Sequence, residues 1–277
     1  MLSELVLLFQ NINSVYLVTL TLLGISLLIA ALEDLKSWDS FTNDGILSWK
    51  ISKLNFYWKS RGLIAKYLET ILCEKNFKTT VYLRILLSSC LVVLSCFGVV
   101  YPTLILVLFF LHFLIGLRNH YSLDGAHQMY MVILFALSLG SFAGVDSNIS
   151  IYCLWFITAE LIISYFIAGI TKITSPIWRT SSAINVIFAT RSYGSAFLYN
   201  LFRQNNTLAV ISSWCVFLFE MLFFIVLFCD PIYTPIFFGL GFIFHLSNAI
   251  FMGLNSFLFA FSITYPSLMF CVSMLHQ

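Results

Sequence analysis

Long apolar runs recur along this chain, and mostly short polar stretches separate them. Hydrophobic residues make up 60% of the sequence, charged residues make up 9%, and the mean hydropathy is +0.96, far outside the range of a soluble globular domain. A helix crosses the hydrocarbon layer of a bilayer in about 20 residues, and its backbone polar groups are satisfied internally. The runs therefore predict an all-α, polytopic integral membrane protein.

The apolar runs predict a bundle of about eight transmembrane helices, forming one domain over 1–277. The expected spans are 15–32, 82–100, 103–117, 129–143, 149–170, 208–228, 232–252 and 256–275. Residues 1–15 are expected to form a short amphipathic or interfacial helix. Pro102 and Pro231 fall in turns between spans, where the missing backbone N–H costs nothing.

Two segments interrupt the series of spans. Residues 33–84, the basic segment, hold nine of the fourteen basic residues together with tryptophan and tyrosine, which suits the membrane interface. The pattern over 49–59 predicts a helix along the surface. Residues 173–206 are less hydrophobic and are expected to be partly re-entrant. By the positive-inside rule the basic side is cytoplasmic, which places Lys172 inside.

The charge balance and the cysteines exclude several other classes. Net charge is +2 and the basic residues form no continuous stripe, so nucleic acid is not an expected partner. The seven cysteines form no CxxC pair, and in apolar runs a thiol behaves as a small hydrophobe. No metal site is expected. The lipid bilayer is the partner that composition indicates.

A single lysine closes the fifth span. The stretch 165–172 reads YFIAGITK, and Trp178 and Arg179 follow it as candidate binding or structural groups. A lysine at a helix end costs little if its ammonium reaches the headgroups, whereas one held inward is desolvated and can become a base. Whether Lys172 is held inward decides between a structural and a catalytic role.

A polar segment precedes the fourth span. His120, Asp124 and His127 are spaced i, i+4 and i+7, which would place them on one helical face, and Gln128 adds a fourth polar group. A carboxylate between two imidazoles can relay protons or bind a metal. Alternatively, Asp124 caps the helix that follows.

Polar side chains in the middle of apolar runs are the other candidates, because each is costly to keep there. Glu220 lies centrally in the sixth span and must be paired or protonated. His245 and Asn248, at i and i+3 in the seventh span, are expected to meet partners on another helix. We expect Glu220 and His245 to face the bundle interior, whether their role is structural or functional.

Three stretches, in this order along the chain, resemble the HTTM group, the membrane domain shared by vitamin K-dependent gamma-carboxylases and many bacterial proteins. Asn119 and His120 look like a segment with an active-site residue. The stretch 165–172, with Trp178, looks like the segment that ends in the base lysine. Residues 244–248, FHLSN, look like a later His-x-x-Asn span. The resemblance implies that Lys172 and His120 are catalytic, and it places the lysine on the extracytoplasmic side, opposite to the charge count.

The bacterial branch of that group is at least as similar. Residues 123–128, LDGAHQ, the pair Phe219 and Glu220, and the span with His245 look like the sporulation-delaying-protein B type. Members of that branch are small membrane proteins implied in maturation or export of a secreted antimicrobial peptide. The carboxylases carry a large substrate-binding domain after their last span, whereas this sequence stops at Gln277. The bacterial resemblance implies a plasma-membrane location.

Three functions remain open at this point. The chain could assist maturation, modification or export of a secreted peptide, with Lys172, His120 and Asp124 as catalytic residues. It could be a carboxylase-like enzyme in which Lys172 deprotonates a lipid quinol that arrives from the bilayer. It could also be a non-enzymatic scaffold or immunity protein whose polar groups only join helices.

Overall fold

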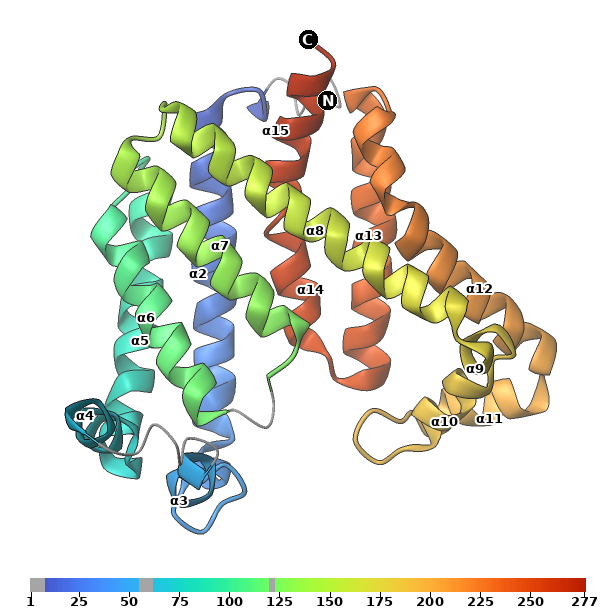
Figure 1. The fold of residues 1–277 in the computed structure, drawn as a ribbon, viewed down its shortest axis with the longest axis horizontal. Coiled ribbons are helices and arrows are strands. Elements are labelled where there is room, and N and C mark those ends of the chain that lie inside the picture. The colour runs from blue at the N-terminus through green and yellow to red at the C-terminus, as the bar shows by residue number, and fades with distance from the viewer. Residues whose placement is uncertain (1–7, 55–61, 120–122) are drawn as a thin grey trace. The chain divides into compact units, whose positions relative to one another are not determined.

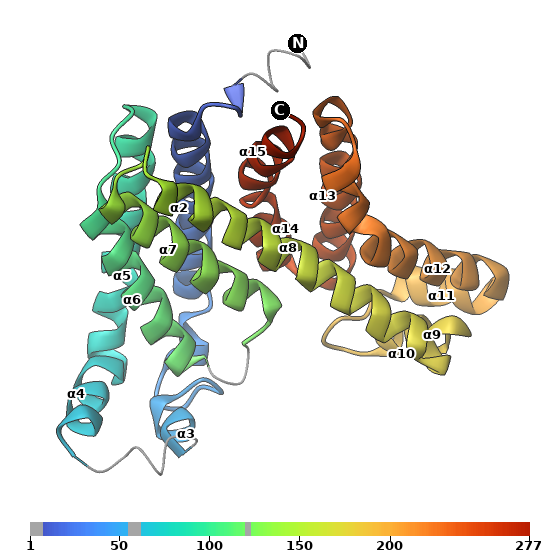
Figure 2. The same cartoon turned by 45° about the horizontal axis from the view of Figure 1, so that its top comes forward.

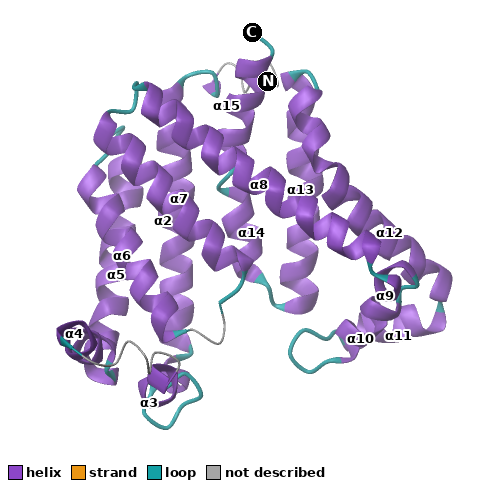
Figure 3. Cartoon of the chain, viewed as in Figure 1, coloured by secondary structure: helices purple, strands orange, loops and turns teal. Residues whose placement is uncertain are grey.

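A computed structural model describes residues 8–54, 62–119 and 123–277, and within them it contains helices and no strands (Figure 3). Seven helical segments of this part of the chain are long and apolar enough to cross a membrane, and one shorter apolar helix accompanies them. The predicted all-α, polytopic fold with about eight spans is confirmed. These segments are α2 (Ile12–Lys36), α5 (Glu74–Cys96), α6 (Pro102–Arg118, the shorter one), α7 (Gly125–Ala143), α8 (Asn148–Thr174), α12 (Asn206–Leu222) with η4 (Phe223–Phe228), α13 (Thr234–Met252) after η5 (Pro231–Tyr233), and α14 (Asn255–Ser262) with α15 (Tyr265–Leu275).

The helices group into two compact units. The first unit comprises Tyr16–Cys153, with α2, α5, α6 and α7. The second comprises Met1–Val15 and Leu154–Gln277, with most of α8 and all later helices. The expectation that 1–277 acts as one HTTM-like domain stays a prediction.

The first unit is a set of membrane helices that pack along one another. Figures 1 and 2 both show α6 and α7 side by side, and these two helices share an extensive contact. Close approach between α2 and α5 depends on a small residue: a Cβ on Gly24 would lie only 2.7 Å from the side chain of Val92. The buried stripe of α2 includes Leu20, Leu23 and Leu27, at helical spacing.

The basic segment is more helical than its sequence indicates. The membrane helices extend into it, since α2 continues to Lys36 and α5 begins at Glu74. Between them lie η1 (Trp38–Phe41), α3 (Trp49–Ser52) and α4 (Leu63–Leu72). The surface helix predicted over 49–59 is only four residues long in its described part, and 55–61 lie outside the described residues. The longer amphipathic helix is α4, which follows it.

Arg118, at the end of α6, connects this helix to the basic segment. Its side chain is fully buried. Its guanidinium donates to the backbone carbonyls of Leu47, at 3.0 Å, and of Phe41 and Leu72, and it lies 4.8 Å from the ring centroid of Phe77. A guanidinium presents five donors in a fixed fork, so one side chain can join three separate stretches of backbone. We call this arrangement the Arg118 clamp.

The second unit contains a broken span. The predicted helix 256–275 is two helices, α14 and α15, separated at Ile263 and Thr264. Pro266 explains the break, because proline has no backbone N–H to donate and its ring clashes with the carbonyl four residues earlier. It occupies the first turn of α15, where a donor is not needed. Figures 1 and 2 show α13 and α14 side by side, and the two helices contact each other extensively.

Three short helices occupy the segment predicted to be partly re-entrant. They are α9 (Pro176–Arg179), α10 (Ser182–Ala189) and α11 (Ala196–Gln204). Ile184 and Phe202 pack with Ala209 of α12 into a small apolar cluster, so the segment folds back onto the start of the next span. Its re-entrant position in a bilayer stays a prediction.

Candidate functional site

Lys172 lies in the last turn of α8 and forms an ion pair with Glu220 of α12. Its Nζ lies 2.8 and 2.6 Å from the two carboxylate oxygens. The lysine side chain is 19% exposed and the glutamate side chain 5%, so the ammonium is held inward by the carboxylate. The same Nζ lies 5.5 Å from the ring centroid of Trp178, a cation–π distance. Arg179, beside that tryptophan, is exposed. The prediction that Glu220 faces inward with a polar partner is confirmed.

A glycine allows α8 and α12 to come close enough for this pair. A Cβ on Gly169 would lie 2.4 Å from the backbone nitrogen of Met221 and 2.7 Å from its Cα. Met221 directly follows Glu220, so the two helices come close together next to the ion pair. Any larger residue at 169 would have to push α12 away, because the atoms it meets are backbone atoms.

Tyr165 and His245 form a second polar contact in the same unit. The tyrosine hydroxyl lies 2.8 Å from Nε2 of His245, and both side chains are buried. The hydroxyl of Tyr265 lies nearby, since a Cβ on Gly241 would meet it at 2.6 Å and the Tyr165 hydroxyl at 3.2 Å. The inward orientation and polar partner predicted for His245 are confirmed. Aromatic rings surround this contact, from Phe219, Phe223, Phe244, Phe257 and Phe261.

Asn248 lies one turn after His245 and is half-buried. Its backbone carbonyl accepts a hydrogen bond from the N–H of Leu254 at 3.3 Å. Gly253, in the left-handed conformation with φ of 72°, ends α13 at this point. The described contacts of Asn248 therefore involve the end of the helix.

One face of α8 positions both polar contacts. Tyr165, Gly169 and Lys172 are spaced i, i+4 and i+7, which places them on the same side of the helix. This face meets α12 through Gly169 and Lys172, and α13 through Tyr165. The stretch 165–172, which the sequence analysis identified, therefore carries one side chain of each of these two polar contacts.

Asp124 caps a helix. Its backbone is extended, with φ of −119° and ψ of 178°, and its carboxylate accepts from the backbone N–H of His127 at 2.9 Å. Helix α7 therefore begins after Asp124, and the expectation that 120–127 form one helical face is wrong. The alternative, a helix cap, is confirmed. His120 lies outside the described residues, and Gln128 lies in the first turn of α7.

The interior of the first unit holds two histidines in contact. The rings of His112 and His127 are stacked, with centroids 4.1 Å apart. His112 is buried, and neither of its ring nitrogens has a hydrogen-bond partner in the described part of the chain. The sequence interpretation placed His112 at the membrane interface with no function, because a lone histidine in an apolar run does not indicate its neighbours. Within the described residues no group of three or more His, Cys, Asp or Glu side chains could hold a metal ion.

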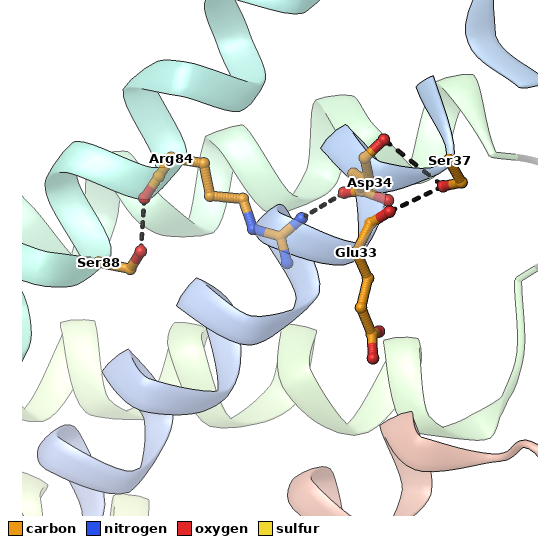
Figure 4. Close-up of polar contacts among 5 residues, drawn as sticks. All are labelled: Glu33, Asp34, Ser37, Arg84 and Ser88. Atoms are coloured by element: carbon orange, nitrogen blue, oxygen red, sulfur yellow. Dashed lines mark hydrogen bonds and ion pairs between the residues drawn. The ribbon is translucent and has the colours of Figure 1, made fainter. Parts of the chain in front are cut away.

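A second buried ion pair lies in the first unit (Figure 4). A guanidinium nitrogen of Arg84 lies 3.1 Å from a carboxylate oxygen of Asp34, and the two side chains are 3% and 17% exposed. The hydroxyl of Ser88 donates to the carbonyl of Arg84 at 2.6 Å. Sequence reasoning missed this pair because Asp34 was placed just outside the first span and Arg84 at the boundary between the basic segment and the second span. Two oppositely charged residues at the ends of neighbouring spans were the available signal.

No protein-family model matches the chain, and no curated protein or solved structure matches it either. The fold and its buried polar contacts define an integral membrane protein, embedded in lipid, with several membrane-spanning helices.

Proposed function

We propose that this chain is an HTTM-type protein of a bacterial plasma membrane that assists the maturation, modification or export of a small secreted peptide. The proposal combines the three resembling stretches with one structural observation: Lys172 is held inward, in contact with Glu220, on the face of α8 that also carries Tyr165. An inward ammonium beside a carboxylate places a proton donor and a proton acceptor in direct contact.

The chemistry of this pair supports a role for Lys172 as a base. When a substrate approaches, the ammonium transfers a proton to the Glu220 carboxylate, which leaves a neutral amine and a neutral acid. The amine then accepts a proton from the substrate, and Glu220 can return its own proton to the product. Apart from this pair, His120 and Asp124 stay separate catalytic predictions from the sequence, and His127, Gln128, Trp178 and Arg179 stay predicted binding groups.

A specific observation favours the non-enzymatic scaffold as the second candidate. Glu220 engages Lys172 with both oxygens, and Asp124 is engaged as a helix cap. Both residues then have a structural role that needs no substrate. In this alternative the ion pair joins α8 to α12 and the protein acts through its surface.

The arginine variant separates the two functions. Lys172→Arg keeps a positive charge beside Glu220, but a guanidinium does not release its proton at any relevant pH. Secreted peptides are compared by mass spectrometry in cells with the wild-type chain, without it, and with Lys172→Arg at equal membrane levels. Lys53→Arg is the matched control, because Lys53 pairs with Glu69 at 2.9 Å but both side chains are largely exposed.

We expect loss of one processed peptide in the strain without the chain and in Lys172→Arg, with Lys53→Arg unchanged. Peptide output that needs the chain but tolerates Lys172→Arg would favour the scaffold. Identical secreted peptides with and without the chain would overturn both. A carboxylated product that requires added quinol would assign the carboxylase-like alternative.

A further inference from the structure

Helix α4 carries one broad apolar face, and the first unit covers only part of it. Leu72 is fully buried and Leu68 is half-buried, and both pack into the cluster around Phe41 and Phe77. The rest of that face, turned by about 120° on average at 100° per residue, is exposed: 74% for Leu63, 67% for Tyr67 and 37% for Ile71. These three residues, the outer face of α4, need another apolar partner.

Helix α4 is joined directly to a membrane-spanning helix. Helix α4 ends at Leu72 and α5 begins at Glu74, so only Cys73 separates them. Figure 1 shows α4 nearly end-on while α5 runs up the page, so α4 lies across the end of α5. Where α5 leaves the bilayer, a helix joined to its end in this way can lie along the lipid headgroups.

Positive charge adjoins the outer face. Lys66 on α4 and Lys75 at the start of α5 are exposed. Tyrosine and aliphatic residues with neighbouring lysines are typical of helices that lie in the membrane interface, where apolar side chains enter the boundary of the acyl chains and ammonium groups meet anionic headgroups. A second copy of the chain would bring the same lysines together, which is unfavourable.

We propose that the outer face of α4 is a binding surface for anionic lipid, with Leu63, Tyr67 and Ile71 in the headgroup boundary and Lys66 and Lys75 on the lipid phosphates. The surface belongs to the first unit and is independent of the function proposed for Lys172. It ties the position of the basic segment to the lipid composition of its leaflet.

Photocrosslinking tests the occupant of this surface directly. Tyr67 is replaced by benzoylphenylalanine in the full chain, which is placed in nanodiscs of phosphatidylcholine with one third phosphatidylglycerol. Phe110, 54% exposed on α6, is the lipid-facing control position. Glu69 is the matched control on α4, because two residues further on it points about 200° away from Tyr67.

We expect lipid adducts at positions 67 and 110 and few at 69, with phosphatidylglycerol enriched at 67 only. Lys66→Gln with Lys75→Gln should lower that enrichment at least fivefold, since each lysine near an anionic surface changes binding by about that factor. Adducts at 67 to a second copy or another protein would overturn the proposal, as would lipid adducts at 110 alone. Equal enrichment at 67 and 110 would contradict the role of the lysines.

Discussion

Arg118 in the first unit and Lys172 in the second are held in different ways. In the first unit, Arg118 donates to the backbone carbonyls of Phe41, Leu47 and Leu72. In the second, Lys172 meets the carboxylate of one other side chain, Glu220. A guanidinium on carbonyls is a permanent charge with no group to take its proton, whereas an ammonium on a carboxylate has an acceptor in contact. The first arrangement holds a fixed charge in place, whereas the second allows a proton to pass between two side chains.

The largest effect is expected from removing the Arg118 clamp. Arg118→Met would leave three buried carbonyls without their donors, at about 1–3 kcal/mol each. We expect a loss of about 4 kcal/mol or more in the free energy of unfolding, measured in detergent micelles. Arg118→Lys should recover only part of this, because one ammonium cannot reach three separate carbonyls. Full stability of Arg118→Lys would show that charge alone is needed.

The next effect concerns the Lys172–Glu220 pair. Glu220→Ala should cost about 2–4 kcal/mol, since it leaves an inward ammonium without its partner. Adding Lys172→Met removes that charge and should bring stability back to within about 1 kcal/mol of wild type. A double-mutant cycle of the unfolding free energy measures the coupling. If the double variant is less stable than Glu220→Ala, the methionine does not pack, and the unpaired ammonium of Lys172 is not the cause of the lost stability.

A glycine comparison tests the close approach of α8 and α12. Gly169→Ala should destabilise by about 1–3 kcal/mol, because its Cβ meets the backbone of Met221. Gly239 on α13 is the matched control: a Cβ there meets nothing within 4 Å, so Gly239→Ala should leave stability unchanged or raise it by up to about 1 kcal/mol, because alanine favours a helix more than glycine does. A loss of stability in Gly239→Ala as large as that in Gly169→Ala would show that the contact with Met221 is not its cause.

The smallest effect is expected at the Tyr165–His245 hydrogen bond. Tyr165→Phe keeps the ring among its aromatic neighbours and removes only the hydroxyl, at a cost of about 1 kcal/mol. Tyr152→Phe is the control, because Tyr152 is 67% exposed on the same helix. Imidazole NMR signals of His245 should shift in the first variant and stay in place in the second. An unshifted His245 signal would place its polar partner elsewhere.

The sequence predicted which side chains turn inward better than it predicted their partners. The inward orientation of Glu220 and His245 follows from the cost of a polar group in an apolar run. Their partners, Lys172 and Tyr165, depend on which helices are neighbours, and periodicity within one helix carries no such information. Lys172 was recognised as a candidate, but its carboxylate was 48 residues away along the chain.

The positions where helices begin and end were the second feature that the sequence predicted incorrectly. Asp34 was placed outside the first span and Arg84 at the edge of the second because charged residues usually mark the end of a span, whereas pairing allows both to lie inside extended helices. The helical face proposed for Asp124 and His127 failed because spacing at i and i+3 occurs equally in a helix cap. Pro266 divides the last span although the apolar run continues through it.

The Arg118 clamp also has a consequence for the order of events during synthesis. The carbonyl of Phe41 is made 77 residues before the guanidinium that binds it. At about 5–20 residues per second, several seconds pass before Arg118 is added. During that interval the part of the basic segment that is rich in tryptophan and lysine has been synthesised, but the Arg118 side chain that binds its carbonyls has not. A nascent chain that stalls before its third span would present that stretch, unfastened, to proteases and chaperones.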